Sequence, residues 1–189
     1  MYSLIENDVK KLVNADEQSL AFVLSHFKLV SVKRNHLLLK EGDVCRTCYF
    51  INKGCVQAYY LDRNNDEATR DFFFEGQWMT NIDSFSKQEP SKEFYRAIEP
   101  AELLAIDRDN FFQLIGKVPE FMEAYRQILE ASYSHSIKRI NSFNAMDALE
   151  RLQWVSEYQP HILTRLSSKI TASYIGVSPE TLSRLKAKL

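Results

Sequence analysis

The spacing of apolar residues divides the chain into a helical start, an extended middle and a helical end. Five apolar residues near the start recur at helical intervals: Leu12, Val13, Leu20, Val23 and Leu24. This spacing predicts one helix over residues 8–27. From about Leu29 to Ile106 the apolar and aromatic residues form short runs, separated by turn signals such as Glu41-Gly42-Asp43. Short strands at such intervals are typical of an antiparallel roll or jelly roll.

The pattern returns to helical spacing after the last of these strands. Asp109 is expected to cap a helix over residues 110–115, and Gly116 is expected to end it. Pro119 suits the first turn of the next helix, which we predict over Pro119–Phe143. Its apolar residues step by three or four and make one seam: Met122, Tyr125, Leu129, Tyr133, Ile137 and Ile140. The seam is roughly 30 Å long, and its own domain or a second copy of the chain can bury it.

The C-terminal part has the spacing of a helix-turn-helix. We predict a helix over residues 148–157, a turn or short helix from Pro160, and two short helices from about Ser167 that meet at Gly176. Glycine supplies the left-handed backbone that such a turn needs. The apolar residues around the turn are expected to face the interior: Ala172, Ile175, Val177, Leu182 and Leu185. A unit of this type places its second helix in the major groove of DNA.

That second helix carries the main candidate DNA-binding side chains. Ser178 is expected to cap it, and Pro179 to occupy its first position. Glu180 can accept a hydrogen bond from a cytosine amino group, and Arg184 can bind guanine through two donors. With the residues suited to phosphate contacts, the predicted DNA-binding set is Lys169, Ser178, Pro179, Glu180, Thr181, Ser183, Arg184, Lys186 and Lys188. The alternative interpretation is a plain helical hairpin whose charges are solvated.

The distribution of charge fits a local contact with a polyanion. The chain has 24 basic and 25 acidic residues, a net charge of −1, which argues against a surface that coats nucleic acid throughout. Residues 165–189 hold five basic residues and one acidic residue, a balance of +4, so the remaining residues carry −5. Basic residues also favour the C-terminal ends of helices, so charge alone does not decide between these explanations.

Other features of the sequence favour a cytoplasmic protein that is not an enzyme. There is no apolar run long enough to span a membrane, and no apolar segment of a signal peptide near the start. Cys45, Cys48 and Cys55 are interpreted as ordinary reduced thiols, the alternative being redox or metal chemistry at the lone Cys-x-x-Cys pair. The strand region holds only His36, whereas a cupin-type metal site needs a histidine pair. No metal site and no catalytic residue are predicted.

In its order of elements and its motifs, the sequence resembles the Crp/Fnr family of bacterial transcription regulators, named after the cyclic-AMP receptor and the fumarate–nitrate regulator. In the strand region the resemblance rests on Leu38-Leu39 to Gly42 and on the segments over residues 49–54, 74–78 and 102–106. In the last two helices it rests on Ile175-Gly176-Val177-Ser178-Pro179-Glu180-Thr181-Leu182-Ser183-Arg184.

The resemblance implies an α+β fold in three parts. Residues 1–116 would form an antiparallel β-roll, a double-stranded β-helix of the cyclic-nucleotide-binding type, with flanking helices. Residues 117–144 would form a long dimerisation helix, and residues 145–189 a helix-turn-helix without an obvious wing. The sequence stops at Leu189, on the second helix, where relatives commonly add a β-hairpin wing, so the chain either works without a wing or is truncated.

The resemblance also implies partners. A homodimer joined through the long helix would present two second helices to double-stranded DNA, about 34 Å apart on a near-palindromic operator. Pro179, Glu180 and Arg184 fall at the family's base-reading positions, and the proline replaces a residue that is usually polar or charged. RNA polymerase is a further candidate partner. The alternative function is a ligand-sensing or protein-interaction module whose DNA-binding domain has decayed.

The family's cofactors are not expected in this chain. Its cyclic-nucleotide binders hold ribose and phosphate with a Gly-Glu pair and an Arg-Ser pair, and those positions are here Thr80-Asn81 and Ser91-Lys92. Both key charges are missing, although Lys92 or Arg96 could offer a cation, so cyclic AMP is not expected. Haem and an iron–sulfur cluster are not expected either, because the histidines are isolated and no cysteine precedes Cys45.

An unknown small effector other than cyclic AMP is nevertheless expected in the roll. The residues predicted to bind it, for example as a small anion, are Thr80, Asn81, Ser91 and Lys92. The alternative is a roll filled by its own aromatic side chains, which leaves no room for a ligand. The aromatic residues suited to that filling are Phe72, Phe74, Trp78, Phe85 and Phe94.

Overall fold

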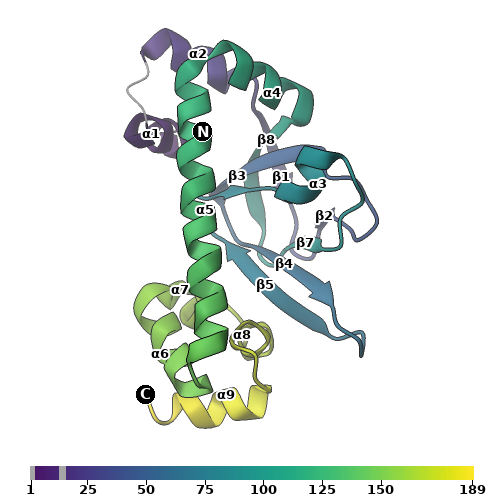
Figure 1. The fold of residues 1–189 in the computed structure, drawn as a ribbon, viewed down its shortest axis with the longest axis vertical. Helices are drawn as coiled ribbons and strands as arrows, with labels where there is room; N and C mark the ends of the chain where they lie inside the picture. Colours follow the sequence, from purple (N-terminus) through teal and green to yellow (C-terminus); the bar gives the residue numbers. More distant parts are fainter. Residues whose placement is uncertain (1–2, 13–15) are drawn as a thin grey trace. The chain divides into compact units, whose positions relative to one another are not determined.

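The computed structural model describes residues 3–12 and 16–189, and its elements are labelled in Figure 1. The chain forms two compact units. The first comprises Met1–Tyr60 and Asp71–Glu130, and the second comprises Leu61–Arg70 and Ala131–Leu189. The boundary between the two units at Glu130 lies within the helix Pro119–Ala145. The division of the chain into residues 1–116, 117–144 and 145–189 stays a prediction.

The first unit begins with α1 (Ser3–Leu12) and α2 (Glu17–Leu24). The prediction of one helix over residues 8–27 is therefore wrong. Asp16 has an extended backbone, with φ −71° and ψ 164°, and its side chain accepts a hydrogen bond from the backbone N–H of Ser19. An aspartate in this conformation starts a new helix rather than continuing an old one. Residues 13–15, and with them Val13 of the predicted helix, lie outside the described residues.

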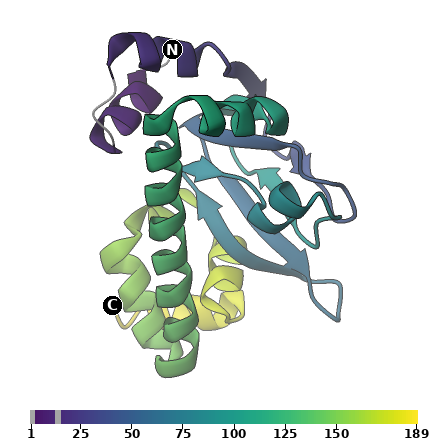
Figure 2. The same ribbon diagram turned by 45° about the horizontal axis from the view of Figure 1, so that its top comes forward.

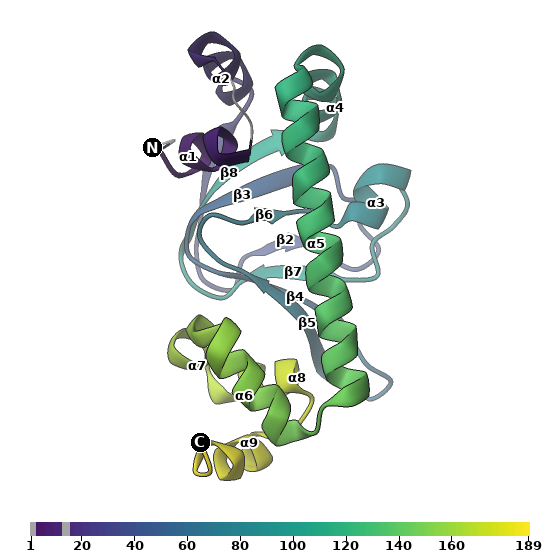
Figure 3. The ribbon, with the colours of Figure 1, turned by 60° about the vertical axis from the view of Figure 1, so that its left-hand side comes forward.

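Two four-stranded antiparallel sheets form the roll, with strand orders β1-β8-β3-β6 and β2-β7-β4-β5 (Figure 3). The strands are β1 (Lys28–Val32), β2 (Leu37–Leu39), β3 (Thr47–Lys53), β4 (Val56–Leu61), β5 (Glu67–Phe73), β6 (Trp78–Met79), β7 (Phe94–Ala97) and β8 (Ala101–Asp107). The predicted antiparallel roll is confirmed. The short helix α3 (Ile82–Lys87) and strand β7 were not predicted.

One hydrophobic core joins the two sheets. Phe50 and Ile51 on β3 and Leu103 and Leu104 on β8 are fully buried, and so is Ala58 on the other sheet. Burial of this apolar surface is the main driving force for folding of the roll. These buried residues lie in the short apolar runs between turn signals from which the strands were predicted.

Helix α4 (Arg108–Lys117) follows β8 and leads into α5 (Pro119–Ala145), as Figure 2 shows. Asp107, and not the predicted Asp109, caps α4 by accepting from the N–H of Asn110 at 2.9 Å. Gly116 lies inside α4 and does not end it. The helix ends at Lys117, because Val118 precedes a proline and such a residue favours extended backbone.

The second unit contains the C-terminal half of α5 and four further helices, grouped together in Figure 3. These are α6 (Ala148–Tyr158), α7 (Pro160–Arg165), α8 (Ser168–Ile175) and α9 (Pro179–Lys186), close to their predicted positions. Their core side chains are fully or almost fully buried: Leu152, Val155, Ile162, Ala172, Tyr174, Ile175 and Leu182. Among the described residues, no helix combines the length and the apolar character needed to cross a membrane.

Candidate functional site

The turn between α8 and α9 is built on Gly176. Its backbone is left-handed, with φ 79° and ψ 42°, and its N–H donates to the carbonyl of Ala172. A Cβ atom at this position would lie 2.8 Å from Cε1 of Phe143. Glycine is therefore required both by the backbone conformation and by the space available. The predicted turn of the helix-turn-helix is confirmed.

Helix α9 buries one face and exposes the other. Ser178 caps it as predicted, accepting from the N–H of Thr181, and Pro179 follows in the first turn. Leu182 is fully buried and Leu185 is half-buried, so they hold the helix to the unit. The remaining predicted DNA-binding residues on and beyond α9 are exposed, apart from half-buried Thr181: Glu180, Ser183, Arg184, Lys186 and Lys188.

The exposed face of α9 holds an acidic group, Glu180, in its first turn and a basic group, Arg184, in its last turn. The pKa of Glu180 is lowered, first by its own backbone N–H and then by the Ser178 hydroxyl, with the charge of Arg184 adding to the effect. Glu180 is therefore an ionised acceptor at neutral pH. The guanidinium of Arg184 donates to the Thr181 hydroxyl at 3.3 Å. Lys169, the predicted phosphate contact on α8, is also exposed.

Two arginines that the sequence did not single out bind the carbonyls at the end of α8. Arg139, on α5, donates to the carbonyl of Tyr174 and lies over the Tyr174 ring, 3.6 Å from its centroid. Arg151, on α6, donates to the carbonyl of Ile175 at 2.9 Å. Both guanidinium groups also lie over the ring of Phe143, at 4.5 and 5.0 Å. These bonds satisfy carbonyls that have no partner within the helix.

A serine of α8 binds the backbone of a distant segment in the same unit. The hydroxyl of Ser173 donates to the carbonyl of Glu67 at 2.7 Å and accepts from the N–H of Thr69 at 2.9 Å. Residues 61–70 comprise the end of β4, the turn after it and the start of β5, and they group with the helices and not with the first unit. Sequence spacing gave no signal of this contact.

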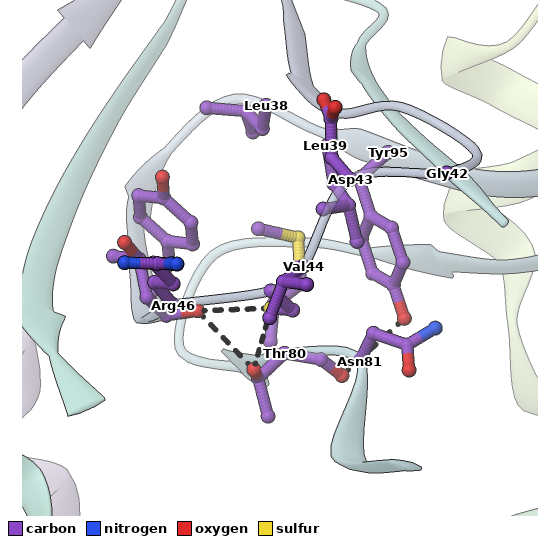
Figure 4. Close-up of a pocket in the computed structure, with 13 residues that line it drawn as sticks. Leu38, Leu39, Gly42, Asp43, Val44, Arg46, Thr80, Asn81 and Tyr95 are labelled. Atoms are coloured by element: carbon purple, nitrogen blue, oxygen red, sulfur yellow. Dashed lines mark hydrogen bonds between the residues drawn. The ribbon is translucent and has the colours of Figure 1, made fainter. Parts of the chain in front are cut away.

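The roll contains a cavity of about 480 Å³, shown in Figure 4. Its lining combines apolar, polar and charged residues: Leu38, Leu39, Gly42, Asp43, Val44, Cys45, Arg46, Thr47, Tyr49, Met79, Thr80, Asn81 and Tyr95. Thr80 and Asn81 of the predicted effector site therefore face this cavity. Figure 4 places Asn81 and Tyr95 at one side of it, across from Arg46.

The other two predicted effector residues do not line the cavity. Ser91 is buried and accepts from the amide of Asn81 at 3.3 Å, whereas Lys92 is exposed. Arg96, the other candidate cation, donates to the side chain of Gln57 at 2.8 Å. The five aromatic residues considered as a filling are also absent from the lining.

The three cysteines are buried free thiols. The Sγ atom of Cys45 lies 3.4 Å from the hydroxyl of Thr80 at the cavity. Burial, assisted by the neighbouring Cys45, raises the pKa of the Cys48 thiol, which disfavours the reactive thiolate. Within residues 3–12 and 16–189, no group of three or more histidine, cysteine or acidic side chains is placed to hold a metal ion.

Comparison with known proteins identifies relatives of both units. Residues 29–117 match the family model of the cyclic nucleotide-binding domain. The chain is 24% identical to the fumarate and nitrate reduction regulatory protein of Yersinia pestis, over 82% of this chain and 65% of the relative. It thus spans slightly less than two thirds of that protein's length. It is 21% identical to the cAMP-activated global transcriptional regulator CRP of Salmonella typhimurium, over 89% of this chain and 85% of the relative.

A solved structure shares the fold over most of both chains. The c-di-GMP responsive global regulator CLP of Xanthomonas campestris aligns with a TM-score of 0.73 at 18% identity, covering 92% of this chain and 91% of that one. All three named relatives are regulators and not enzymes. The matched domain, the similarity to both founding regulators and the shared fold agree with the motifs of the roll and of α9. Residues 29–117 thus match the cyclic nucleotide-binding domain, and the chain as a whole is similar to regulators of the Crp/Fnr family.

Proposed function

We propose that this chain is a transcription regulator that binds double-stranded DNA through α9. The observation that carries the proposal is the division of α9 into a buried face, at Leu182, and an exposed face with Glu180, Ser183 and Arg184. The first turn of such a helix meets base edges when the helix lies in the major groove. The relatives described above are transcription regulators, which supports the same function.

In this proposal the side chains at the interface fall into two groups, one that reads bases and one that binds phosphates. Glu180 accepts from a cytosine amino group and Arg184 binds guanine, so these two side chains read the sequence. Lys169, Lys186 and Lys188 contact phosphates, which position the protein without specifying bases. Pro179 has no polar side chain, so we expect fewer base contacts at the start of α9 than a polar residue would allow.

A second copy of the chain would complete the regulator. The seam of α5 leaves large apolar side chains open, with exposed fractions of 46% for Met122, 70% for Tyr133 and 54% for Ile140. Pairing along this seam removes apolar surface from water and places two copies of α9 on one operator. The operator would be a near-palindrome with half-sites about 34 Å apart.

The roll would sense a small effector in its cavity, and RNA polymerase would be contacted by the DNA-bound dimer. The cavity volume of about 480 Å³ lies within the range of small-molecule sites. Because the cavity is in the first unit and α9 in the second, an effector would act through the chain that joins them, above all α5.

The proposal is tested by selecting bound sequences from a random DNA library with the full chain, then measuring affinity by fluorescence anisotropy. Arg184→Ala should weaken binding to the selected site by about 1–3 kcal/mol and relax preference at one base pair, while Lys188→Ala should weaken all sequences alike. Arg34→Ala, which removes an exposed charge from the roll, is the matched control.

The dependence on salt separates the two functions considered. Phosphate contacts make the logarithm of affinity fall steeply with the logarithm of salt concentration. If the wild-type chain binds no DNA even at low salt, it is instead a ligand-sensing or protein-interaction module. If Arg184→Ala and Arg34→Ala behave alike on the selected site, α9 does not read the bases.

A further inference from the structure

One carboxylate of the roll, that of Glu93, is held by donors from the cavity wall. Its Oε2 atom accepts from the side-chain amide of Asn81 at 2.9 Å and lies 3.2 Å from the hydroxyl of Tyr95. The one hydrogen of that hydroxyl is shared between Glu93 and the carbonyl of Thr80, which lies at 3.3 Å. Both donors belong to residues that line the cavity, whereas Glu93 does not line it. Tyr95 is buried, and Asn81 and Glu93 are half-buried. Hydrogen bonds to an ionised group in such a setting are among the strong ones.

The orientation of the Asn81 amide is fixed independently of Glu93. Asn81 caps α3, and its Oδ1 atom accepts from the N–H of Ser84 at 2.9 Å. Since the oxygen is needed there, the NH₂ group must point the other way, where it meets Glu93 and the hydroxyl of Ser91. Because Asn81 caps α3, its NH₂ group is already oriented to donate to a group at the position of the Glu93 carboxylate.

Ser91 fixes Glu93 from the backbone side. The hydroxyl of Ser91 donates to the carbonyl of Glu93 and accepts from its N–H, both at 3.0 Å. Ser91 is buried, with 4% of its surface exposed. Backbone and side chain of Glu93 are thus both held in place, and the carboxylate stays among its donors without a rearrangement.

We propose that Asn81 and Tyr95 form a carboxylate-binding site whose resident occupant is the chain's own Glu93. In the wild-type chain this site is filled, and both hydrogens of the Asn81 amide are engaged within the protein. An incoming carboxylate or phosphate would find no free amide hydrogen at Asn81 and would lie close to the charge of Glu93, which disfavours it. The effector of the roll, under the proposed function, is therefore a molecule without an anionic group at this wall.

The inference concerns the roll alone, so it can fail while DNA binding holds, and the reverse. It is tested on the full chain with Glu93→Ala, which opens the site, and with Glu89→Ala as the matched control. Glu89 is an exposed glutamate of the same loop. The midpoint of thermal unfolding is measured in sodium acetate and in sodium chloride at equal ionic strength and pH 7.

We expect acetate to raise the midpoint of Glu93→Ala above its value in chloride, with a saturable dependence on concentration. Wild type and Glu89→Ala should have the same midpoint in both salts. If Glu93→Ala does not fold in chloride, recovery of folded protein in acetate supports the proposal, and failure in both salts contradicts it. Equal midpoints of Glu93→Ala in the two salts overturn it, as does an acetate effect of the same size in the wild type.

Discussion

The guanidinium of Arg139 lies 3.6 Å from the centre of the Tyr174 ring and donates to the carbonyl of the same residue. Tyr174 is fully buried near the end of α8, one residue before the last of that helix. A single side chain of α5 thereby holds both the ring and the backbone of the helix that precedes the turn at Gly176. The position of α9 depends on this contact, because the turn follows it directly.

Loss of Arg139 should therefore destabilise the second unit. We expect Arg139→Ala to lower the free energy of unfolding by about 2–3 kcal/mol, from a charged hydrogen bond and a partly buried cation–π contact. Arg126→Ala is the control, because its ion pairs with Glu123 and Glu130 are exposed to solvent and such pairs contribute little to stability. Urea unfolding followed by circular dichroism measures both. A loss no larger than that of the control would show that the contact contributes little.

Gly176 and Gly116 should respond in opposite directions to alanine. Gly176→Ala is expected to cost about 1–2 kcal/mol for the left-handed backbone alone, with a further cost from the contact with Phe143. Gly116 lies in α4 with open space around its Cβ position, so Gly116→Ala should stabilise the chain by about 0.5–1 kcal/mol. Thermal unfolding of the two variants decides the matter. Equal shifts in the same direction would contradict the assignment of the turn.

Acid should remove the stabilisation given by the Asp107 cap. Hydrogen bonds from Asn110, first through its backbone N–H, hold the pKa of Asp107 below its ordinary value of 3.8. A lowered pKa in the folded state means that the contribution is complete above about pH 3.8 and is lost as pH falls through the folded value. Asp107→Ala should cost about 1 kcal/mol at pH 7 and much less at pH 2, measured by urea unfolding. The same cost at both values would rule out the charged cap.

A charge placed on the α5 seam should prevent pairing of two copies. Ile140→Asp introduces a carboxylate where 54% of an apolar side chain is exposed, and burial of an unpaired charge is strongly unfavourable. Ser134→Asp adds the same charge at an exposed position outside the seam. Sedimentation velocity should show a dimer for wild type and Ser134→Asp and a monomer for Ile140→Asp. A dimer for all three would place the interface elsewhere.

The sequence predicted those elements whose boundaries are set locally. Gly176, Ser178 and Pro179 each act through their own backbone or a neighbour's, and the turn and cap between α8 and α9 follow the prediction. Two aspartates stood near the start of α4, and periodicity did not separate them. Asp107 is the cap because it still has the extended backbone of β8, with φ −73° and ψ 160°.

Features that depend on distant residues were not predicted. Strand β7 exists because β2 and β4 pair with it on either side, and its own residues give a weak signal. The carbonyls bound by Arg139 and Arg151 lie 35 and 24 residues further along the chain. Asn81 was recognised as a residue of interest, but its roles as helix cap and as donor to Glu93 depend on how α3 and β7 pack.

The contact of Ser173 with residues 67–69 has a practical consequence for anyone who wishes to isolate the helical unit. Cutting the chain at Glu130 would give a fragment that keeps Ser173 but lacks the backbone groups of Glu67 and Thr69 that it binds. In such a fragment, the side of α8 that carries Ser173 would be exposed to solvent, whereas residues 67–69 contact it in the intact protein. A fragment that keeps the contacts of the helical unit would need residues 61–70 attached to it.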